Sequence, residues 1–305
     1  MRSILLLAVS GLITSAVVAC DICGCGAGSA YIGILPEFSS KVFGVRYRYN
    51  SLLTHIGAGG VRTYLTTDEK YRTADIWGGW NIGKRFRVIG SAPVHFNEKL
   101  KEGVATRRQG MGDISMQGYY QLVNSKRSKD TRLWVQSLWI GGGLKLPSGK
   151  YEQPDKSRQL PTTNIFQTGT GSIDFTLNAM YDLRVQDAGI NTTLSYKINT
   201  VNASDYRYGN KLSAGMQGYY KWRIIEKVTI APNAGLIFEN AAKDQDGKYA
   251  ASTSGGYLLL ATTGLETSFK RMSAGANWQP PLAQHLAGGF VKAGNRVMVH
   301  VSYTL

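Results

Sequence analysis

The residues best suited to chemistry are three cysteines near the start of the chain. They form the segment Cys20-Asp21-Ile22-Cys23-Gly24-Cys25, and the sequence contains no other cysteine. Soft thiolates at this spacing could bind Cu(I) or zinc, although a closed structural zinc site normally has four ligands. A disulfide between Cys23 and either Cys20 or Cys25 would form in an oxidising compartment. An odd number of cysteines leaves one thiol over.

A third interpretation concerns Cys20 alone. The segment Val17-Val18-Ala19-Cys20 resembles a lipobox, with valine where leucine is usual. Cys20 would then become a lipidated N-terminus that tethers the protein to a membrane. Lipidation, a disulfide and a copper or zinc site all remain open, and only the last of them requires a cofactor.

The remaining nucleophiles and bases do not predict an enzyme. No two of the four histidines, His55, His95, His285 and His300, are spaced as metal ligands on one face. Ser302 follows His300 on the same face of a strand, but the sequence contains neither a Gly-x-Ser-x-Gly elbow nor a phosphate loop. We therefore expect no catalytic residues and no enzymatic activity.

The first residues indicate export. Arg2 precedes the apolar run 4–18, which ends in small residues and is too short to span a bilayer comfortably as a helix. We predict a signal peptide over 1–19, a Cys/Gly-rich periplasmic segment over 20–38 and one membrane domain over 39–305.

The charge balance is strongly basic. The chain of 305 residues has a formal net charge of +15, while only 18% of its residues are charged. Because the protein is exported, we do not expect nucleic acid as its partner. Basic turns near anionic lipid headgroups would explain the charge, and so would a basic lumen that favours anionic solutes.

Long strands of alternating polarity dominate the rest of the sequence. In the last segment, Val297, Val299 and Val301 alternate with polar residues, and Ile190–Ile198 follows the same rule. A period of two residues gives a strand one apolar and one polar face. Several of these runs reach ten residues or more, which matches a tilted strand that crosses a bilayer.

About twelve such strands can be counted. They span 39–49, 71–83, 86–97, 110–123, 131–146, 169–184, 189–200, 208–223, 227–239, 257–269, 271–280 and 295–305. The connections alternate between short ones, such as Lys84-Arg85, and long ones, such as 98–109, 147–168 and 281–294. This alternation is typical of an all-β, transmembrane, antiparallel up-and-down β-barrel with short periplasmic turns and longer outer loops.

Barrels of this kind are found in the outer membrane of Gram-negative bacteria. A sheet that spans a membrane must close on itself, because lipid cannot hydrogen-bond an open strand edge. We therefore expect as partners outer-membrane lipid and lipopolysaccharide, a small-molecule solute and the outer-membrane assembly machinery. The final strand supports the last of these, since it ends on Leu305 with Tyr303 two residues earlier.

The polar faces of the predicted strands give the candidates for a lumen lining or selectivity filter. They include charges of both signs, which could pair across the lumen or select solutes. The candidates are Arg46, Arg48, Asp75, His95, Asp113, Asp174, Asp182, Lys197, Lys221 and His300.

Three glycine-rich motifs lie at strand ends, in the order Gly110-Met111-Gly112-Asp113, Gly143–Gly149 with Pro147, and Gly169-Thr170-Gly171-Ser172-Ile173-Asp174. Glycines at such positions permit tight turns and bends at a barrel rim. In this order and spacing the motifs resemble those of the phenol meta-pathway degradation outer-membrane protein family, which is distantly similar to FadL-type channels. The resemblance covers roughly residues 40–305 and implies a transporter-like barrel for small hydrophobic or aromatic compounds.

Three functions follow as hypotheses. The first is a channel that admits small hydrophobic or aromatic compounds by passive diffusion. The second is a metal-linked envelope protein that binds copper or zinc through Cys20, Cys23 and Cys25, with the barrel as anchor or exit route. The third is a structural or interaction barrel with a closed lumen.

Overall fold

The computed structural model describes residues 41–129, 132–152, 166–225 and 228–305. The predicted signal peptide, the segment 20–38 and the three cysteines lie outside these residues. No helix in the described ranges combines the length and the apolar character that a membrane-spanning helix needs.

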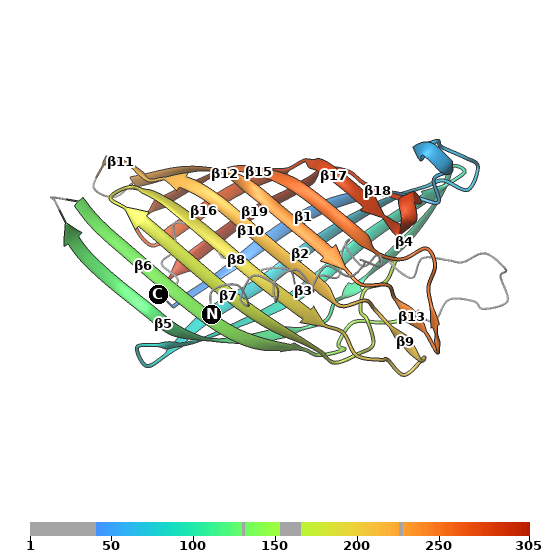
Figure 1. Ribbon diagram of the computed structural model, residues 1–305, viewed down its shortest axis with the longest axis horizontal. Coiled ribbons are helices and arrows are strands. Elements are labelled where there is room, and N and C mark those ends of the chain that lie inside the picture. Colours follow the sequence, from blue (N-terminus) through green and yellow to red (C-terminus); the bar gives the residue numbers. More distant parts are fainter. Residues whose placement is uncertain (1–40, 130–131, 153–165, 226–227) are drawn as a thin grey trace, which may run out of the picture.

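Twelve antiparallel crossings form one closed sheet (Figure 1). Eight crossings are single strands: β1 (Val42–Thr54), β2 (Thr67–Ile82), β3 (Phe86–Lys101), β6 (Arg132–Lys145), β7 (Asp174–Val185), β8 (Ala188–Ile198), β12 (Val228–Ala241) and β15 (Gly256–Phe269). Each of the other four joins two strands: β4 (Val104–Met111) with β5 (Ser115–Lys129), β10 (Lys211–Tyr220) with β11 (Trp222–Ile225), β16 (Met272–Gln279) with β17 (Pro281–Leu286), and β18 (Val291–Ala293) with β19 (Arg296–Thr304).

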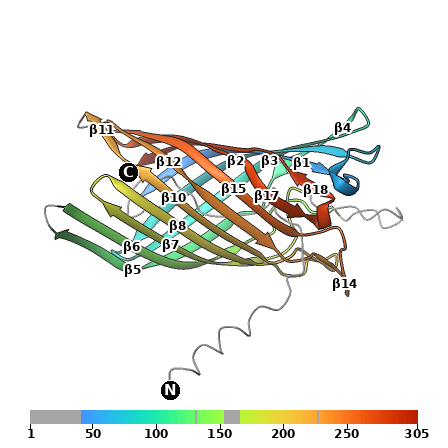
Figure 2. The same ribbon diagram turned by 45° about the horizontal axis from the view of Figure 1, so that its top comes forward.

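The first and last crossings close the barrel. β1 pairs with β19 from Val42 opposite Thr304 to Tyr49 opposite Val297, and with β18 beyond that point. The turned view shows the sheet wrapping around one interior (Figure 2). Closure satisfies the backbone groups that lipid could not, and it confirms the predicted fold class.

The two faces of the strands differ as the alternation predicts. In β1, Phe43 and Val45 point outward and are more than half exposed, whereas Val42 and Arg46 are buried inside. Aliphatic side chains predominate on the outward face in the middle of the wall, where Tyr47, Tyr181 and Trp278 also face outward. Further aromatic rings gather toward both ends. Those at the short-turn end are Trp80, Phe86, Tyr120, Trp134, Tyr220, Trp222 and Phe269, and those at the loop end are Phe96, Phe175, Tyr196, Phe238 and Tyr257. This apolar band with two aromatic girdles is typical of an outer-membrane barrel.

The expectation of a long loop at 98–109 was wrong. β3 continues to Lys101, and Glu102 and Gly103 turn the chain directly into β4. Both turn residues have positive φ, 48° and 80°, as a two-residue type I′ hairpin requires. This hairpin extends beyond the apolar part of the wall, so its residues are charged on both faces. A charged segment of this kind looks like a loop in the sequence.

Two other expected strand limits also differ. The prolines after Gln279 do not end a strand, because the crossing resumes at Pro281 after an irregular register opposite Leu259 and Leu260. A proline fits such an irregularity, where one backbone donor is not needed. Residues 169–173 are not part of β7 but form a turn before it.

The long loops carry a small sheet and two short helical turns. β9 (Tyr206–Arg207), β13 (Gln245–Asp246) and β14 (Tyr249–Ala250) pair with one another outside the barrel wall. The turns η1 (Ala58–Gly60) and η2 (Ala287–Gly289) lie at the same end (Figure 1). The short connections are at the other end, together with the C-terminal Leu305.

Candidate functional site

The three glycine-rich motifs converge on one buried carboxylate. Asp113 accepts hydrogen bonds from the backbone N–H of Gly149 at 2.9 Å and from the backbone N–H of Thr170 at 2.9 Å. Lys145 Nζ lies 2.5 Å from Asp113 Oδ2. Asp113 therefore ties the beginning and the end of the loop 146–173 to the barrel wall.

A second carboxylate extends this group. Lys145 Nζ lies 2.7 Å from Asp174 Oδ2, and Lys197 Nζ lies 3.5 Å from the same oxygen. Asp174 Oδ1 also accepts from the hydroxyl of Ser172 and the backbone N–H of Thr200. We call Asp113, Lys145, Asp174 and Lys197 the motif cluster. Two lysines and two carboxylates neutralise each other inside the wall, which is how buried charges are stabilised.

The glycines of the motifs permit this close packing. A Cβ at Gly149 would lie 2.7 Å from the Cα of Gly169, and a Cβ at Gly169 would lie 2.5 Å from the backbone of Gly149. Gly171 has a φ of 71°, which favours glycine. Sequence analysis assigned these residues to turns at the rim but did not foresee that the three turns touch each other.

The described end of the same loop lies inside the barrel mouth. Phe166 and Gln167 are buried, and the ring of Phe166 makes an edge-on contact with Tyr71 at 6.3 Å between centroids. Arg108 donates to the backbone oxygen of Phe166 and to Gln167 Oε1. The folded loop thus places an aromatic side chain against the interior wall.

An exposed ion pair holds the outer part of this loop. Arg108 lies 2.5 Å from Glu152, and Lys150 lies 3.0 Å from the same carboxylate. The hydrogen bond from Lys150 and the charge of Arg108 hold the pKa of Glu152 below its ordinary value. The carboxylate therefore stays charged and paired at neutral pH.

Other predicted lumen residues meet in a row across neighbouring strands. Asp75 is opposite Arg46, Arg46 is opposite His300, and His300 is opposite Gly275, which is opposite Glu266. We call Asp75, Arg46, His300 and Glu266 the polar girdle. All four side chains are buried, and Arg46 forms an ion pair with Asp75. Sequence analysis missed Glu266, although it alternates with the outward Leu265.

The remaining predicted lumen residues are more dispersed. Arg48 is 3.7 Å from Asp75, and His95 is hydrogen-bonded to Thr73 at 3.0 Å. Asp182 accepts a hydrogen bond from the hydroxyl of Tyr219, and Lys221 lies over the ring of Tyr219 at the short-turn end. These residues line the interior at several heights and do not form one site.

A buried ion pair between β12 and β19 was not predicted from the sequence. Glu239 on β12 accepts two hydrogen bonds of 2.9 Å from Arg296, and Lys211 lies 3.4 Å away. Each residue lies on the inward face of its strand, which the alternation could have shown. The pairing of β12 with β10 brings Glu239 close to Lys211.

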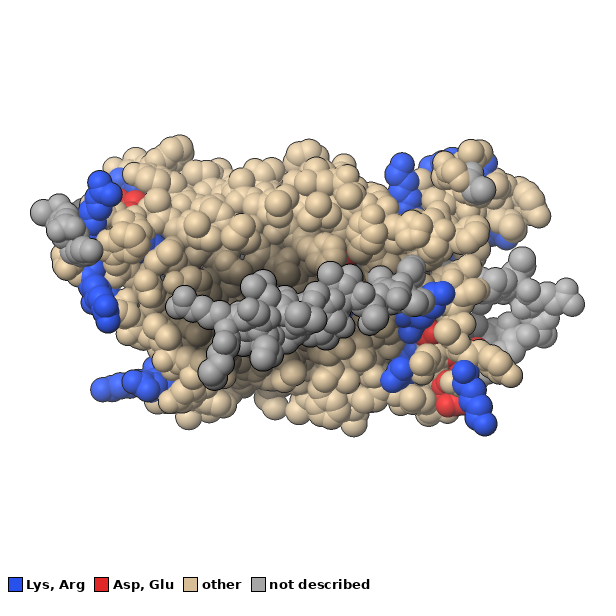
Figure 3. Space-filling view, viewed as in Figure 1, with Lys and Arg blue, Asp and Glu red and all other residues tan. Residues whose placement is uncertain are grey.

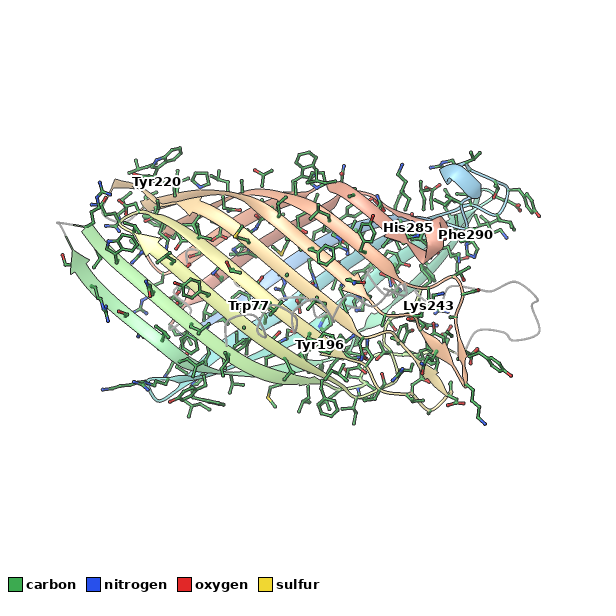
Figure 4. All side chains as sticks on the ribbon, viewed as in Figure 1. Trp77, Tyr196, Tyr220, Lys243, His285 and Phe290 are labelled. Atoms are coloured by element: carbon green, nitrogen blue, oxygen red, sulfur yellow. The ribbon has the colours of Figure 1, made fainter. Side chains whose placement is uncertain are left out.

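Apolar residues occupy the interior at both ends. The loop-end apolar cluster consists of Leu52, Tyr71, Phe166, Ala241, Leu258, Leu260, Leu286, Ala287, Val291 and Ala293. The turn-end aromatic cluster consists of Val42, Trp77, Ile89, Tyr119 and Trp139. Trp77, labelled in Figure 4, lies behind the front strands. These residues share inward faces with Arg46, Asp75 and Glu266, so they belong to the lining and not to the lipid surface.

No group of three or more His, Cys, Asp or Glu residues that could hold a metal ion occurs among the described residues. The described histidines belong to different surroundings, and His285 faces outward beside Tyr257 (Figure 4). The copper or zinc hypothesis concerns Cys20, Cys23 and Cys25, which lie outside the described residues.

No family model and no curated protein matches the chain. Among solved structures, the COG4313 outer membrane channel from Pseudomonas putida F1 is similar over 92% of this chain and 100% of its own, with a TM-score of 0.62 and 12% identity. The β domain of the Bordetella autotransporter BrkA matches over 87% of this chain and 100% of its own at 11% identity, but its TM-score of 0.43 is too low to support an argument. The first match shows a shared fold, that of a bacterial outer-membrane β-barrel.

Proposed function

This chain has the fold of a bacterial outer-membrane channel, and we propose that it admits small hydrophobic or aromatic compounds by passive diffusion. The solute would move through the interior along the loop-end apolar cluster and the turn-end aromatic cluster. No covalent step and no cofactor take part in this mechanism.

The observation that carries the proposal is the apolar character of the lining at both ends. The interior of a water-filled barrel is normally polar. Here buried leucines and aromatic rings face inward where a barrel of this type usually has polar side chains. Apolar surfaces removed from water gain about 25 cal/mol per Å². The cluster side chains are already buried, so the gain comes from the apolar surface of the solute itself when it enters an interior lined in this way. A small aromatic solute has little such surface and would therefore be attracted without being held tightly.

The polar girdle and the motif cluster lie between or beside these apolar surfaces. Arg46 is paired with Asp75 in the first, and Lys145 with Asp113 and Asp174 in the second, so much of their charge is neutralised before a neutral solute meets it. The arrangement supports weak binding at successive positions, which a permeation path requires because each position must also release the solute.

The three glycine-rich motifs support the same proposal from the sequence. They resemble the phenol meta-pathway family, and their contact around Asp113 explains in physical terms why the three motifs would occur together. We propose membership of that transporter-like family on this basis.

The test is a planar-bilayer recording with purified, folded protein. We expect an ionic current that phenol blocks in a concentration-dependent way, whereas arabinose, a small hydrophilic solute without an aromatic ring, does not. Replacing Leu258 and Leu260 by Ser should weaken the block by phenol by about fivefold or more, since two buried apolar side chains are lost. The matched control replaces the outward Tyr257 and Leu265 by Ser.

The three hypotheses can be distinguished by this recording together with a metal analysis of the purified protein. A structural or interaction barrel with a closed lumen would give no current. A metal-linked protein would bind stoichiometric copper or zinc, and the metal would be lost when Cys23 and Cys25 are replaced by Ser. A current that phenol and arabinose affect equally would contradict the proposed preference for aromatic compounds.

A further inference from the structure

Cations crowd the short-turn end of the barrel. The short connections contain eleven Lys and Arg residues but only three Asp and Glu residues. They comprise the segments 83–85, 126–132, 186–187, 221–227 and 270–271. The described cations whose side chains are exposed at this end are Lys41, Lys84, Arg85, Lys126, Arg127, Arg132, Arg223, Lys270 and Arg271. Asp187 is the described acid in these segments, and it is paired with Arg223.

The loop end has a different balance. The segments 55–66, 98–109, 146–173, 199–210, 242–255 and 287–295 contain twelve Lys and Arg residues and seven Asp and Glu residues. Figure 3 shows this difference on one face, with mostly blue side chains and one red patch at the end of β5, β6 and β11, and more red beside the blue at the other end. The excess of cations over acids is therefore larger at the short-turn rim, where it is eight, than at the loop end, where it is five.

The cations at the short-turn end lie beside rings that face lipid. Lys41 Nζ lies 5.0 Å from the ring centre of Trp80, and Lys270 Nζ lies 5.2 Å from that of Phe269. Arg223 directly follows the outward Trp222. Long basic side chains next to interfacial aromatic residues place their charge at the level of the headgroups.

We propose that this rim, which we call the cationic ring, binds the phosphate groups of anionic phospholipids in the periplasmic leaflet. Short turns are periplasmic in outer-membrane barrels, so the ring lies at that leaflet. These lysines and arginines would recognise the anionic phosphodiester of the lipid headgroup.

The distribution of the charges favours lipid over a protein partner. The cations occur at four of the five short connections and at Lys41 beside the last strand, so they follow most of the circumference of the barrel. The fifth connection, 186–187, has no cation of its own, and its Asp187 pairs with Arg223. A folded acidic protein would contact one patch, whereas lipid surrounds the whole rim. The ring is also continuous with the apolar band that lipid covers.

The barrel contains its own reporters for the test. Trp80, Trp134 and Trp222 are outward tryptophans near the cationic ring. The full-length protein is reconstituted in phosphatidylcholine vesicles that contain phosphatidylglycerol, with bromine on the chains of either one lipid or the other. We expect brominated phosphatidylglycerol to quench tryptophan fluorescence about twofold more than brominated phosphatidylcholine at equal mole fraction. The preference should fall in about 0.5 M salt.

The test variant combines Lys84→Gln, Arg85→Gln, Lys270→Gln and Arg271→Gln, and the preference for phosphatidylglycerol should fall toward one. The matched control combines Lys101→Gln, Lys243→Gln, Lys248→Gln and Lys292→Gln at the loop end and should retain it. Equal quenching by both lipids in the wild type would overturn the proposal whether or not the variant folds. So would loss of the preference in the control. The ionic current and its block by phenol are recorded separately, so failure here is distinguishable from failure of the proposed channel.

Discussion

At the scale of single residues, the interior depends on charges that are buried only because each has a partner. Asp113 shows this most clearly, since its two oxygens accept from Gly149, Thr170 and Lys145. If one partner is removed, the remaining charges and N–H groups stay buried without an acceptor or counter-ion. The loss of folding free energy is then larger than the net contribution of the intact pair.

We predict that Asp113→Ala lowers the free energy of unfolding by roughly 3 kcal/mol. Lys145 would keep Asp174 as its partner, but the two loop N–H groups would lose their acceptor. Urea unfolding in detergent, followed by tryptophan fluorescence, measures the change. Asp246→Ala on β13 is the control, because Asp246 is an exposed acid of the outer loops. A loss as small as that of the control would show that the motif cluster does not stabilise the barrel.

Gly275 illustrates a steric limit at one residue. A Cβ at this position would lie 2.6 Å from the His300 ring and 2.7 Å from Cγ of Glu266. Gly275→Ala should therefore destabilise the protein by about 1–3 kcal/mol, as overpacking does.

The matched control for Gly275→Ala is Gly90→Ala, where a Cβ would meet nothing within 4 Å. Both glycines lie within strands, so the backbone effects are similar. The double variant with His300→Ala should recover part of the lost stability in the same unfolding experiment. Equal effects at Gly90 and Gly275 would rule out the clash as the cause.

At the scale of elements, local patterns identified the strands but not how each one ends. The alternation of polar and apolar residues gave the crossings and the inward direction of Arg46, Asp75 and His300. The hairpin at Glu102 and the continuation through Pro281 were missed, because polar residues and prolines in a segment do not distinguish a loop from a strand that leaves the membrane.

The loop 146–173 is an element whose position could not be read from its own residues. Its described end enters the mouth of the barrel because Arg108 and Asn97, on β4 and β3, hold Phe166 and Gln167. Those partners are about sixty or seventy residues away in the chain.

We expect Phe166→Ala to raise the single-channel conductance, since it removes a ring from the interior wall. It should also lower the free energy of unfolding by about 2–4 kcal/mol, as loss of a buried phenylalanine does. Phe290→Ala, at an exposed loop residue, is the control and should change neither quantity. Unchanged conductance in the Phe166 variant would indicate that this ring does not narrow the path.

At the scale of the whole molecule, the solvent on each side explains the arrangement of residues. Outside, hydrocarbon selects aliphatic side chains such as Ile76 and Leu177, and aromatic rings mark its two borders. Inside, charges such as those of Arg46 and Asp75, or of Lys145 and Asp174, pair with each other. Closure of the sheet allows an apolar outer face and a polar inner face in the same strands, because no strand edge is left in lipid.

A charge on the lipid side tests this picture. Ile76 is near the middle of β2, points outward and is 67% exposed to the membrane. Ile76→Arg should cost roughly 2–4 kcal/mol in a folding measurement in vesicles. Ile76→Leu keeps the apolar surface, and Val61→Arg places the same charge on a loop, so both should be nearly neutral. A small cost for Ile76→Arg would contradict the placement of this wall in hydrocarbon.

The class of fold, the approximate number of strands and the inward face of most lumen residues could be predicted from the amino-acid sequence. These properties repeat every two residues, and the strand lengths reflect the thickness of the bilayer, so both are local. The contacts of the three distant motifs at Asp113, of His300 and Glu266 around Gly275, and of Phe166 with Tyr71 became visible in the folded barrel alone. Such contacts depend on the register and tilt of all the strands around a closed barrel, and no segment of the sequence contains that information alone.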